Sequence, residues 1–361
     1  MKDRILSVDI FRGMTIILMI LVNTPGTWSN VFPPLLHAKW HGYTPTDLVF
    51  PFFLFIVGIS IVFAYQNKNT DSNTYKKISI RSLKLIGLGL FLGAFTLSFP
   101  FIKDFSEIRF PGVLQRIGLV FFFASLLFLN FDWKKLIGIS ILFLIGYWIL
   151  MTLVPVNGVA STLERAPNNF ANWLDVKVFG THNYKPDYDP EGLLSTIPSI
   201  VSSLLGIFTG LILLSEEKKK ATILFGLGGV LLLIGSLWDY IFPINKALWT
   251  SSFVLVTAGW ANVILALIYY LTDVKKIKFG SIFRYAGANA IVLYFFSSFI
   301  SKIMGMIMIA DNSLHGWLFK KGYVHNFMSL ELSSLLYGLS VVSFYCVLAY
   351  FLYRKKIFIK V

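Results

Sequence analysis

Residues able to move a proton gather in the segment LLHAKWHGYTPTDLVFPFF, residues 35–53, which contains His37, His41 and Asp47. A neutral imidazole accepts a proton near pH 7, and a neighbouring carboxylate or amide can orient the ring for that task. His37, His41 and Asp47 would alternatively suit a divalent metal ion, but no further His or Cys supplies a clear fourth ligand. We therefore expect no metal site here and favour proton-transfer chemistry.

Further polar residues stand inside otherwise apolar stretches, where an ionisable group is costly and marks a candidate site. They are Asp9, Arg12, Asn23, Asp47, Arg116, Asp239, Arg284 and Asn289. Asp9 and Arg12 lie three apart on one helical face, so they either neutralise each other or serve a function. Arg116 has no acidic residue in its own stretch and requires a partner from another helix, a water-filled cavity or an anionic ligand.

The composition of the whole chain shows what kind of element must position these residues. Of the 361 residues, 56% are apolar and 14% charged, against about 45–50% and about 25% in soluble domains. The mean hydropathy is +0.71. These values exclude a water-soluble globule and indicate an all-α polytopic membrane protein. The single cysteine, Cys346, excludes an intrachain disulfide and a cysteine metal site.

A bilayer core of about 30 Å requires roughly 20 apolar residues per helix, and about ten stretches meet that length. The predicted spans are 9–24, 47–65, 78–99, 112–131, 136–154, 197–214, 221–242, 248–271, 282–300 and 332–353. Connections then alternate between two faces, and one of these holds both termini. We expect a single domain, 1–361, with its longest external loop at 155–196.

The formal charge of +14 is explained by the orientation of these spans. Most Lys and Arg outside the spans fall on the face that holds the termini, and cationic loops are retained in the cytoplasm. Both termini are therefore predicted to be cytoplasmic, and nucleic-acid binding is not needed to explain the charge. The first apolar run ends at Asn23-Thr24-Pro25-Gly26 without a cleavage pattern, so we expect a retained first span. His37 and Asn23 then lie at the external ends of the bundle.

Several blocks of the sequence carry a resemblance to a known family. They are SVDIFRGMTIILMILVN (7–23), HAKWHGYTPTDLVFPFFLFIVG (37–58), RFPGVLQRIGLVF (109–121), DPEGLLSTIPSI (189–200), FPINKALWTSSFV (242–254) and YAGANAIVLY (285–294). In this order they resemble the heparan-alpha-glucosaminide N-acetyltransferase family of transmembrane acyltransferases. The resemblance spans nearly the whole chain.

The resemblance implies that acetyl-CoA from the cytoplasm donates an acetyl group to an amino sugar, or a glycan bearing one, on the far side of the membrane. It also implies that His37 is the essential histidine and that Asn23 belongs to the active site. His37 would act as general base or as a transient acetyl carrier, and Asn23 would donate a hydrogen bond to the thioester oxygen. For Asp47 two roles stay open: orienting His37 and capping the second span.

The phosphates of CoA are expected near cationic residues on the cytoplasmic side. Four candidates follow from position, and they are Arg12, Arg81, Lys84 and Arg284. Arg116 would line the path of the pantetheine arm between the helices. Each is equally compatible with a positive-inside or structural role.

The chain begins almost directly at its first span, so we expect it to lack the large N-terminal luminal region of the animal enzyme and to lie in a bacterial inner membrane. Its acceptor would be a glucosamine-type residue. External aromatic residues suit sugar stacking or an interfacial belt equally well. They include Trp28, Trp40, Trp173 and Tyr184.

The main competing hypothesis is a transporter or flippase whose intramembrane charges line a route for a sugar or anionic solute. The absence of repeat symmetry in the sequence argues against it. Besides membrane lipid, a homodimer is a possible partner that the sequence does not decide.

Overall fold

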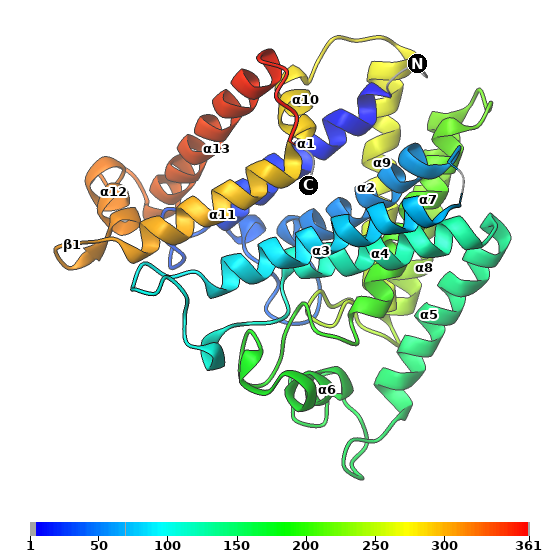
Figure 1. Ribbon diagram of the computed structural model, residues 1–361, viewed down its shortest axis with the longest axis horizontal. Helices are drawn as coiled ribbons and strands as arrows, with labels where there is room; N and C mark the ends of the chain where they lie inside the picture. Colours follow the sequence, from blue (N-terminus) through cyan, green and yellow to red (C-terminus); the bar gives the residue numbers. More distant parts are fainter. Residues whose placement is uncertain (1–4, 69, 360–361) are drawn as a thin grey trace.

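A computed structural model describes residues 5–68 and 70–359. The fold is an all-α helical bundle (Figure 1). Its long helices are α1 (Leu6–Asn23), α2 (Pro45–Tyr65), α3 (Ser72–Ala94), α4 (Val113–Asn130), α5 (Trp133–Leu153), α7 (Thr196–Leu214), α8 (Lys220–Asp239), α9 (Ser251–Tyr269), α11 (Ala290–Met306) and α13 (Leu330–Arg354). Shorter helices are α6 (Phe170–Phe179), α10 (Ser281–Ala288) and α12 (Leu314–Gly322).

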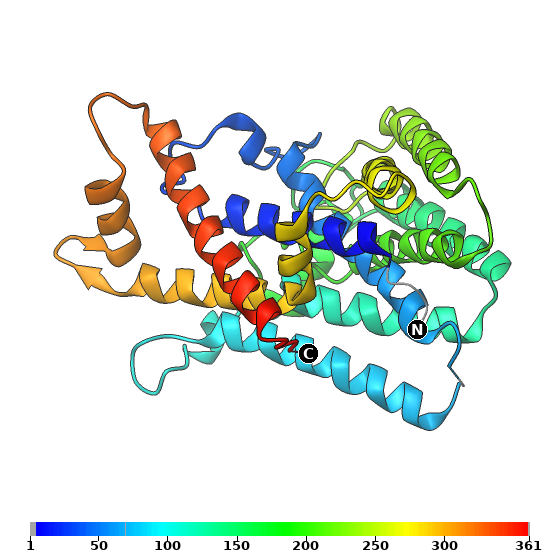
Figure 2. The same cartoon turned by 90° about the horizontal axis from the view of Figure 1, so that it is seen from above.

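Short turns and one strand pair complete the described chain. The turns are η1 (Pro33–Leu35), η2 (Phe105–Glu107), η3 (Gly180–His182) and the π-helical η4 (Tyr270–Val274). Strands β1 (Met308–Ile309) and β2 (Asn312–Ser313) pair antiparallel, with Met308 opposite Ser313. In both views the strand pair and α12 lie at the edge of the bundle away from α8 (Figures 1 and 2).

The helices form an inner and an outer group. In α1, α2, α7 and α9, most of the membrane-length apolar stretch is buried inside the protein. In α5, α8 and α13, only 22–28% of that stretch is buried. The outer helices therefore expose apolar side chains on the surface of the bundle. The inner helix α2 contacts α1, α4, α7 and α9, and α1 also packs against α10, α11 and α13.

Eight described helices are long and apolar enough to cross a membrane, or nine if the bent pair α10–α11 counts as one span. About ten spans were predicted from sequence, so two stretches differ. The predicted span 78–99 corresponds to α3. This helix is too charged to be counted among the helices that could cross a membrane, because it contains Lys76, Lys77, Arg81 and Lys84.

The predicted span 282–300 is broken by a bend of 80° between α10 and α11. Asn289 lies at this break, where its side-chain amide donates to the carbonyl of Ile357 at 2.9 Å and its oxygen accepts from the Ile359 N–H at 3.0 Å. Hydropathy predicts a continuous span here, but the helix is interrupted at Asn289. At this break Asn289 contacts the distant C-terminal segment.

Candidate active site

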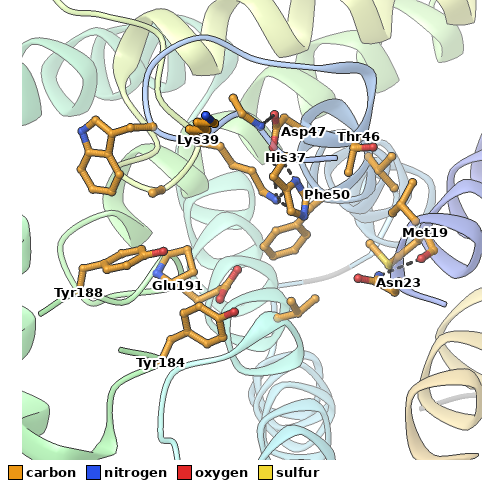
Figure 3. Close-up of a pocket in the computed structure, with 18 of the residues that line it drawn as sticks. Met19, Asn23, His37, Lys39, Thr46, Asp47, Phe50, Tyr184, Tyr188 and Glu191 are labelled. Carbon is orange, nitrogen blue, oxygen red and sulfur yellow. Dashed lines mark hydrogen bonds and ion pairs between the residues drawn. The ribbon is translucent and has the colours of Figure 1, made fainter. Parts of the chain in front are cut away.

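His37, Asn23 and Asp47 line one cavity of about 330 Å³. The cavity lies where α1 ends and α2 begins, and segment 184–191 and the loop before α9 close its other side (Figure 3). Three parts of the chain that are far apart in sequence therefore meet around His37.

His37 is oriented by Asp47. The Nδ1 atom of His37 lies 2.7 Å from Oδ1 of Asp47, whose side chain is only 1% exposed, while His37 is 48% exposed. An ionised carboxylate only accepts hydrogen bonds, so Nδ1 carries the proton and Nε2 keeps a lone pair. This is the arrangement that a general base requires.

The same carboxylate also caps α2. Oδ2 of Asp47 accepts from the backbone N–H groups of Thr44 at 3.0 Å and Ala38 at 2.9 Å, and Thr44 and Asp47 form a capping box. The two roles left open for Asp47 by the sequence are thus both present. The cap fixes the carboxylate, and the fixed carboxylate holds the imidazole.

Asn23 is the last residue of α1 and is exposed to the cavity. Its Nδ2 donates to the carbonyl of Met19 at 2.8 Å. An amide has two N–H groups, so a second proton can point toward a bound carbonyl oxygen.

Lys246 is one of the site residues that were not predicted from the sequence. Its Nζ lies 3.0 Å from Nδ1 and 3.2 Å from Nε2 of His37, and 3.6 Å from Oδ1 of Asp47. Burial lowers the pKa of Lys246, although the Asp47 carboxylate opposes this effect. Its position within the block FPINKALWTSSFV, at the end of an apolar stretch, was the available signal.

His41 is directed away from His37. Its Nε2 lies 3.1 Å from Oε1 of Glu164, and its Nδ1 lies 3.4 Å from the amide nitrogen of Asn245. Within residues 5–68 and 70–359, no group of three or more His, Cys, Asp or Glu side chains is placed to hold a metal ion.

Segment 184–191 forms the wall opposite His37. The guanidinium of Arg109 donates to Asp189 at 2.8 and 2.5 Å and to Glu191 at 2.5 Å, and it lies 4.9 Å from the centre of the Tyr184 ring. Burial opposes the charge on Arg109, but these carboxylates raise its pKa. Of the aromatic residues expected to contact sugar, Trp40 and Tyr184 line the cavity, together with Tyr188, whereas Trp28 and Trp173 do not.

A second cavity of about 660 Å³ lies farther along the same helices, and Arg12, Arg81 and Lys84 line it. Arg12 donates to Asp9 at 3.2 Å and to the hydroxyl of Ser60 at 3.0 Å. The Arg81 guanidinium lies 4.7 Å from the centre of the Phe121 ring. Three of the four cations expected near the CoA phosphates therefore share one hollow.

The two cavities are separated by little protein. Phe50, Val113 and Tyr294 line the first, and Phe53, Ile117 and Ile291 line the second. In each of α2, α4 and α11, the step between the two lining positions is about one helical turn, or roughly 5 Å. A thin apolar partition thus lies between the His37 cavity and the cationic cavity.

Arg116 and Arg284 lie outside the lining of both cavities. Arg116, 1% exposed, donates to the carbonyls of Pro190 at 3.0 Å and Gly192 at 2.9 Å and to the hydroxyl of Ser195. Its partner from another part of the chain is therefore segment 190–195. Arg284 lies 5.4 Å from the centre of the Tyr353 ring. A role in CoA binding stays a prediction for both.

Residues 4–244 match the family model described as heparan-alpha-glucosaminide N-acetyltransferase, catalytic. The chain belongs to this family. It is 31% identical over 423 residues to the human heparan-alpha-glucosaminide N-acetyltransferase, covering all of this chain and 60% of the human protein. The mouse enzyme of the same name is 30% identical, with 99% of this chain and 61% of the mouse protein covered. The chain thus spans about 60% of the length of these members of the family.

Proposed function

We propose that the protein is a membrane-embedded N-acetyltransferase that passes an acetyl group from acetyl-CoA to the amino group of a glucosamine-type sugar. The observation that carries the proposal is the pair of cavities on the same helices, one cationic and one built around His37. Membership of the family supports the reaction class.

The cationic cavity suits the donor. The phosphates of CoA would pair with Arg12, Arg81 and Lys84, and the pantetheine arm would cross the thin partition toward His37. A volume of about 660 Å³ is within the range of small-molecule sites, about 300–1,000 Å³. Under the predicted topology this cavity opens toward the cytoplasm, and the protein would lie in a bacterial inner membrane.

The His37 cavity suits the acceptor. The sugar amine would attack the thioester carbon while Nε2 of His37 takes its proton, and Asn23 would donate to the developing oxyanion. Asp47 keeps His37 in the required tautomer. Trp40, Tyr184 and Tyr188 supply aromatic surface for the sugar ring. The alternative course, through an acetyl group carried on His37, uses the same residues.

The test is transfer of a radiolabelled acetyl group from acetyl-CoA to glucosamine by the purified protein in detergent, with His37→Ala compared with the wild type. We expect transfer by the wild type and a loss of about 10²–10⁴-fold in the variant. Both proteins must show the same thermal melting and gel-filtration behaviour.

Each of the other outcomes would show which part of the proposed function is wrong. Unchanged transfer by His37→Ala overturns the role of His37. CoA binding without transfer overturns the acceptor. Absence of CoA binding favours the transporter or flippase hypothesis.

A further inference from the structure

The proposed reaction moves two protons, and His37 accounts for one of them. The attacking amine loses a proton to Nε2 of His37, while the C–S bond breaks and leaves the thiolate of CoA. A thiol has an ordinary pKa of about 8.5, so protonation of the departing sulfur assists its release near pH 7. The inference below rests on the proposed function and concerns this second proton.

Lys246 is placed to serve both ends of the transfer. Lys246 lines the cavity, and its Nζ lies 3.0 and 3.2 Å from Nδ1 and Nε2 of His37 and 3.6 Å from Oδ1 of Asp47. The side chain is 19% exposed. A cation that only stabilised the fold would not need to face both the base and the space where substrates meet.

The backbone on both sides of Lys246 is fixed. Ile244 accepts from the N–H of Gly42 at 2.7 Å, which ties this loop to the segment that carries His37. Asn245 accepts from the N–H of Leu248 at 2.9 Å through its side chain and from the N–H of Thr250 at 3.1 Å through its carbonyl. The backbone position from which the Lys246 side chain reaches His37 is therefore fixed.

We propose that Lys246 is the general acid of the transfer and exchanges its proton with His37. The N–C bond to the acetyl group forms and the C–S bond breaks. His37 takes the proton of the amine, and the ammonium of Lys246 gives one proton to the sulfur of CoA. The imidazolium of His37 then returns a proton to neutral Lys246 across the observed contact, so both residues are restored and no other reactant is needed.

The surroundings of Lys246 favour donation of its proton. Burial lowers the pKa of the ammonium and so favours release of its proton, while the carboxylates of Asp47 and Glu191 oppose this effect. Arginine at the same position would keep the positive charge but does not release a proton in proteins. The pair of substitutions Lys246→Arg and Lys246→Met thus separates charge from proton donation.

The experiment compares two acetyl donors with glucosamine as acceptor. One is acetyl-CoA, and the other is an acetyl thioester of a nitrothiophenol, whose thiolate leaves without protonation. With acetyl-CoA we expect both substitutions to lower kcat by about 10²–10³-fold. With the aryl thioester we expect the deficit to shrink to less than about tenfold, because the acid is then dispensable.

Lys177, exposed on α6, supplies the matched controls Lys177→Arg and Lys177→Met, for which wild-type rates are expected with both donors. A deficit equal for the two donors overturns the proposal, as does near wild-type transfer from acetyl-CoA by Lys246→Arg. If the wild type does not use the aryl thioester, the acetyl-CoA rates decide. Equal losses in the Arg and Met variants with unchanged CoA affinity support the proposal, and retention in the Arg variant refutes it.

Failure of the proposed function gives a different result. In that case the wild-type protein and the Lys177 controls also fail to transfer from acetyl-CoA, and the inference falls with the function. Should Lys246→Met fail to give a folded protein by melting and gel filtration, Lys246→Arg, which keeps the counter-charge of Asp47, carries the test.

Discussion

At the scale of single residues, the site depends on carboxylates that act through other groups. Asp47 accepts hydrogen bonds from the start of α2 and from His37 at once, so the helix cap and the proposed base share one side chain. Asp175 on α6 has a comparable position behind segment 189–195. It is 2% exposed, and its Oδ1 accepts from the N–H of Leu193 at 2.8 Å.

Asp175 leads to a prediction about stability and pH. Burial raises its pKa from 3.8 to about 7, although the Leu193 N–H opposes this. Between about pH 4 and pH 7 the native state then holds a proton that the unfolded state lacks. The free energy of unfolding should therefore fall with rising pH by up to about 1.4 kcal/mol per unit, and this contribution should be constant above pH 7.

Asp175→Asn retains an oxygen acceptor for Leu193 but cannot ionise. We expect the melting temperature of the wild type, relative to this variant, to fall between pH 5 and 7 and to level off by pH 8. Thermal unfolding in detergent across that range measures it. Parallel pH profiles for the two proteins would contradict the prediction.

At the scale of the elements, helices approach each other at glycines. A Cβ atom at Gly13 of α1 would lie 1.7 Å from the carbonyl oxygen of Phe283 in α10, and one at Gly58 of α2 would lie 1.9 Å from that of Ser203 in α7. These contacts place backbone against backbone and position the helices that line both cavities.

Gly13→Ala should separate α1 from α10. Because the obstructing atom belongs to the backbone, we expect a loss of at least about 1–3 kcal/mol of stability. Gly138→Ala on the outer helix α5 is the matched control, since nothing within 4 Å would meet its Cβ. Melting temperatures compare the two variants, and equal values would show that the crossing tolerates a methyl group.

Arg81 and Lys84 on α3 lead to a prediction about the proposed binding of CoA. Arg81→Gln and Lys84→Gln should each weaken CoA by about tenfold, the equivalent of about 1.4 kcal/mol for one charge-assisted hydrogen bond. Titration calorimetry with CoA measures the change, and binding of pantetheine, which lacks the nucleotide phosphates, should stay unaffected. Lys135→Gln on α5, exposed and outside the cavity lining, serves as control. Equal CoA affinity in all three variants would place the phosphates elsewhere.

At the scale of the whole molecule, the two cavities lie successively along shared helices, and function depends on which membrane face each one meets. The charge distribution predicts that both termini are cytoplasmic and that the His37 cavity opens outward. The sequence contains a single cysteine, Cys346, and it is buried. Cysteines introduced one at a time can therefore report which side of the membrane each position faces.

In a Cys346→Ser background, we expect a membrane-impermeant maleimide added to intact cells to label Lys177→Cys on α6. Lys218→Cys, in the connection between α7 and α8, should react only after the membrane is permeabilised. Both positions are exposed, so access to the reagent is decided by the membrane. The reverse pattern would invert the orientation and place the acceptor site in the cytoplasm.

The sequence by itself predicted the membrane helices, the family and several residues of the candidate site. Membrane helices can be predicted from local sequence, because the bilayer requires a continuous apolar stretch. The ordered blocks from residue 7 to 294 predicted the family that the comparison shows. The sequence predicted that Asn23 and His37 lie at the same end of the bundle and that Asp47 could orient His37, and the structure places all three around one cavity. The sequence also indicated that Asp9 and Arg12 could pair, as they do.

The tertiary structure alone decided the rest, because contacts between distant segments leave no local pattern. Lys246 meets His37 across 209 residues, and Arg116 finds its carbonyl partners 74–76 residues away. The bend at Asn289 is likewise accompanied by hydrogen bonds to residues 68–70 positions along the chain. Hydropathy indicates which segments can lie in the bilayer, whereas the packing of the helices determines which polar groups contact each other.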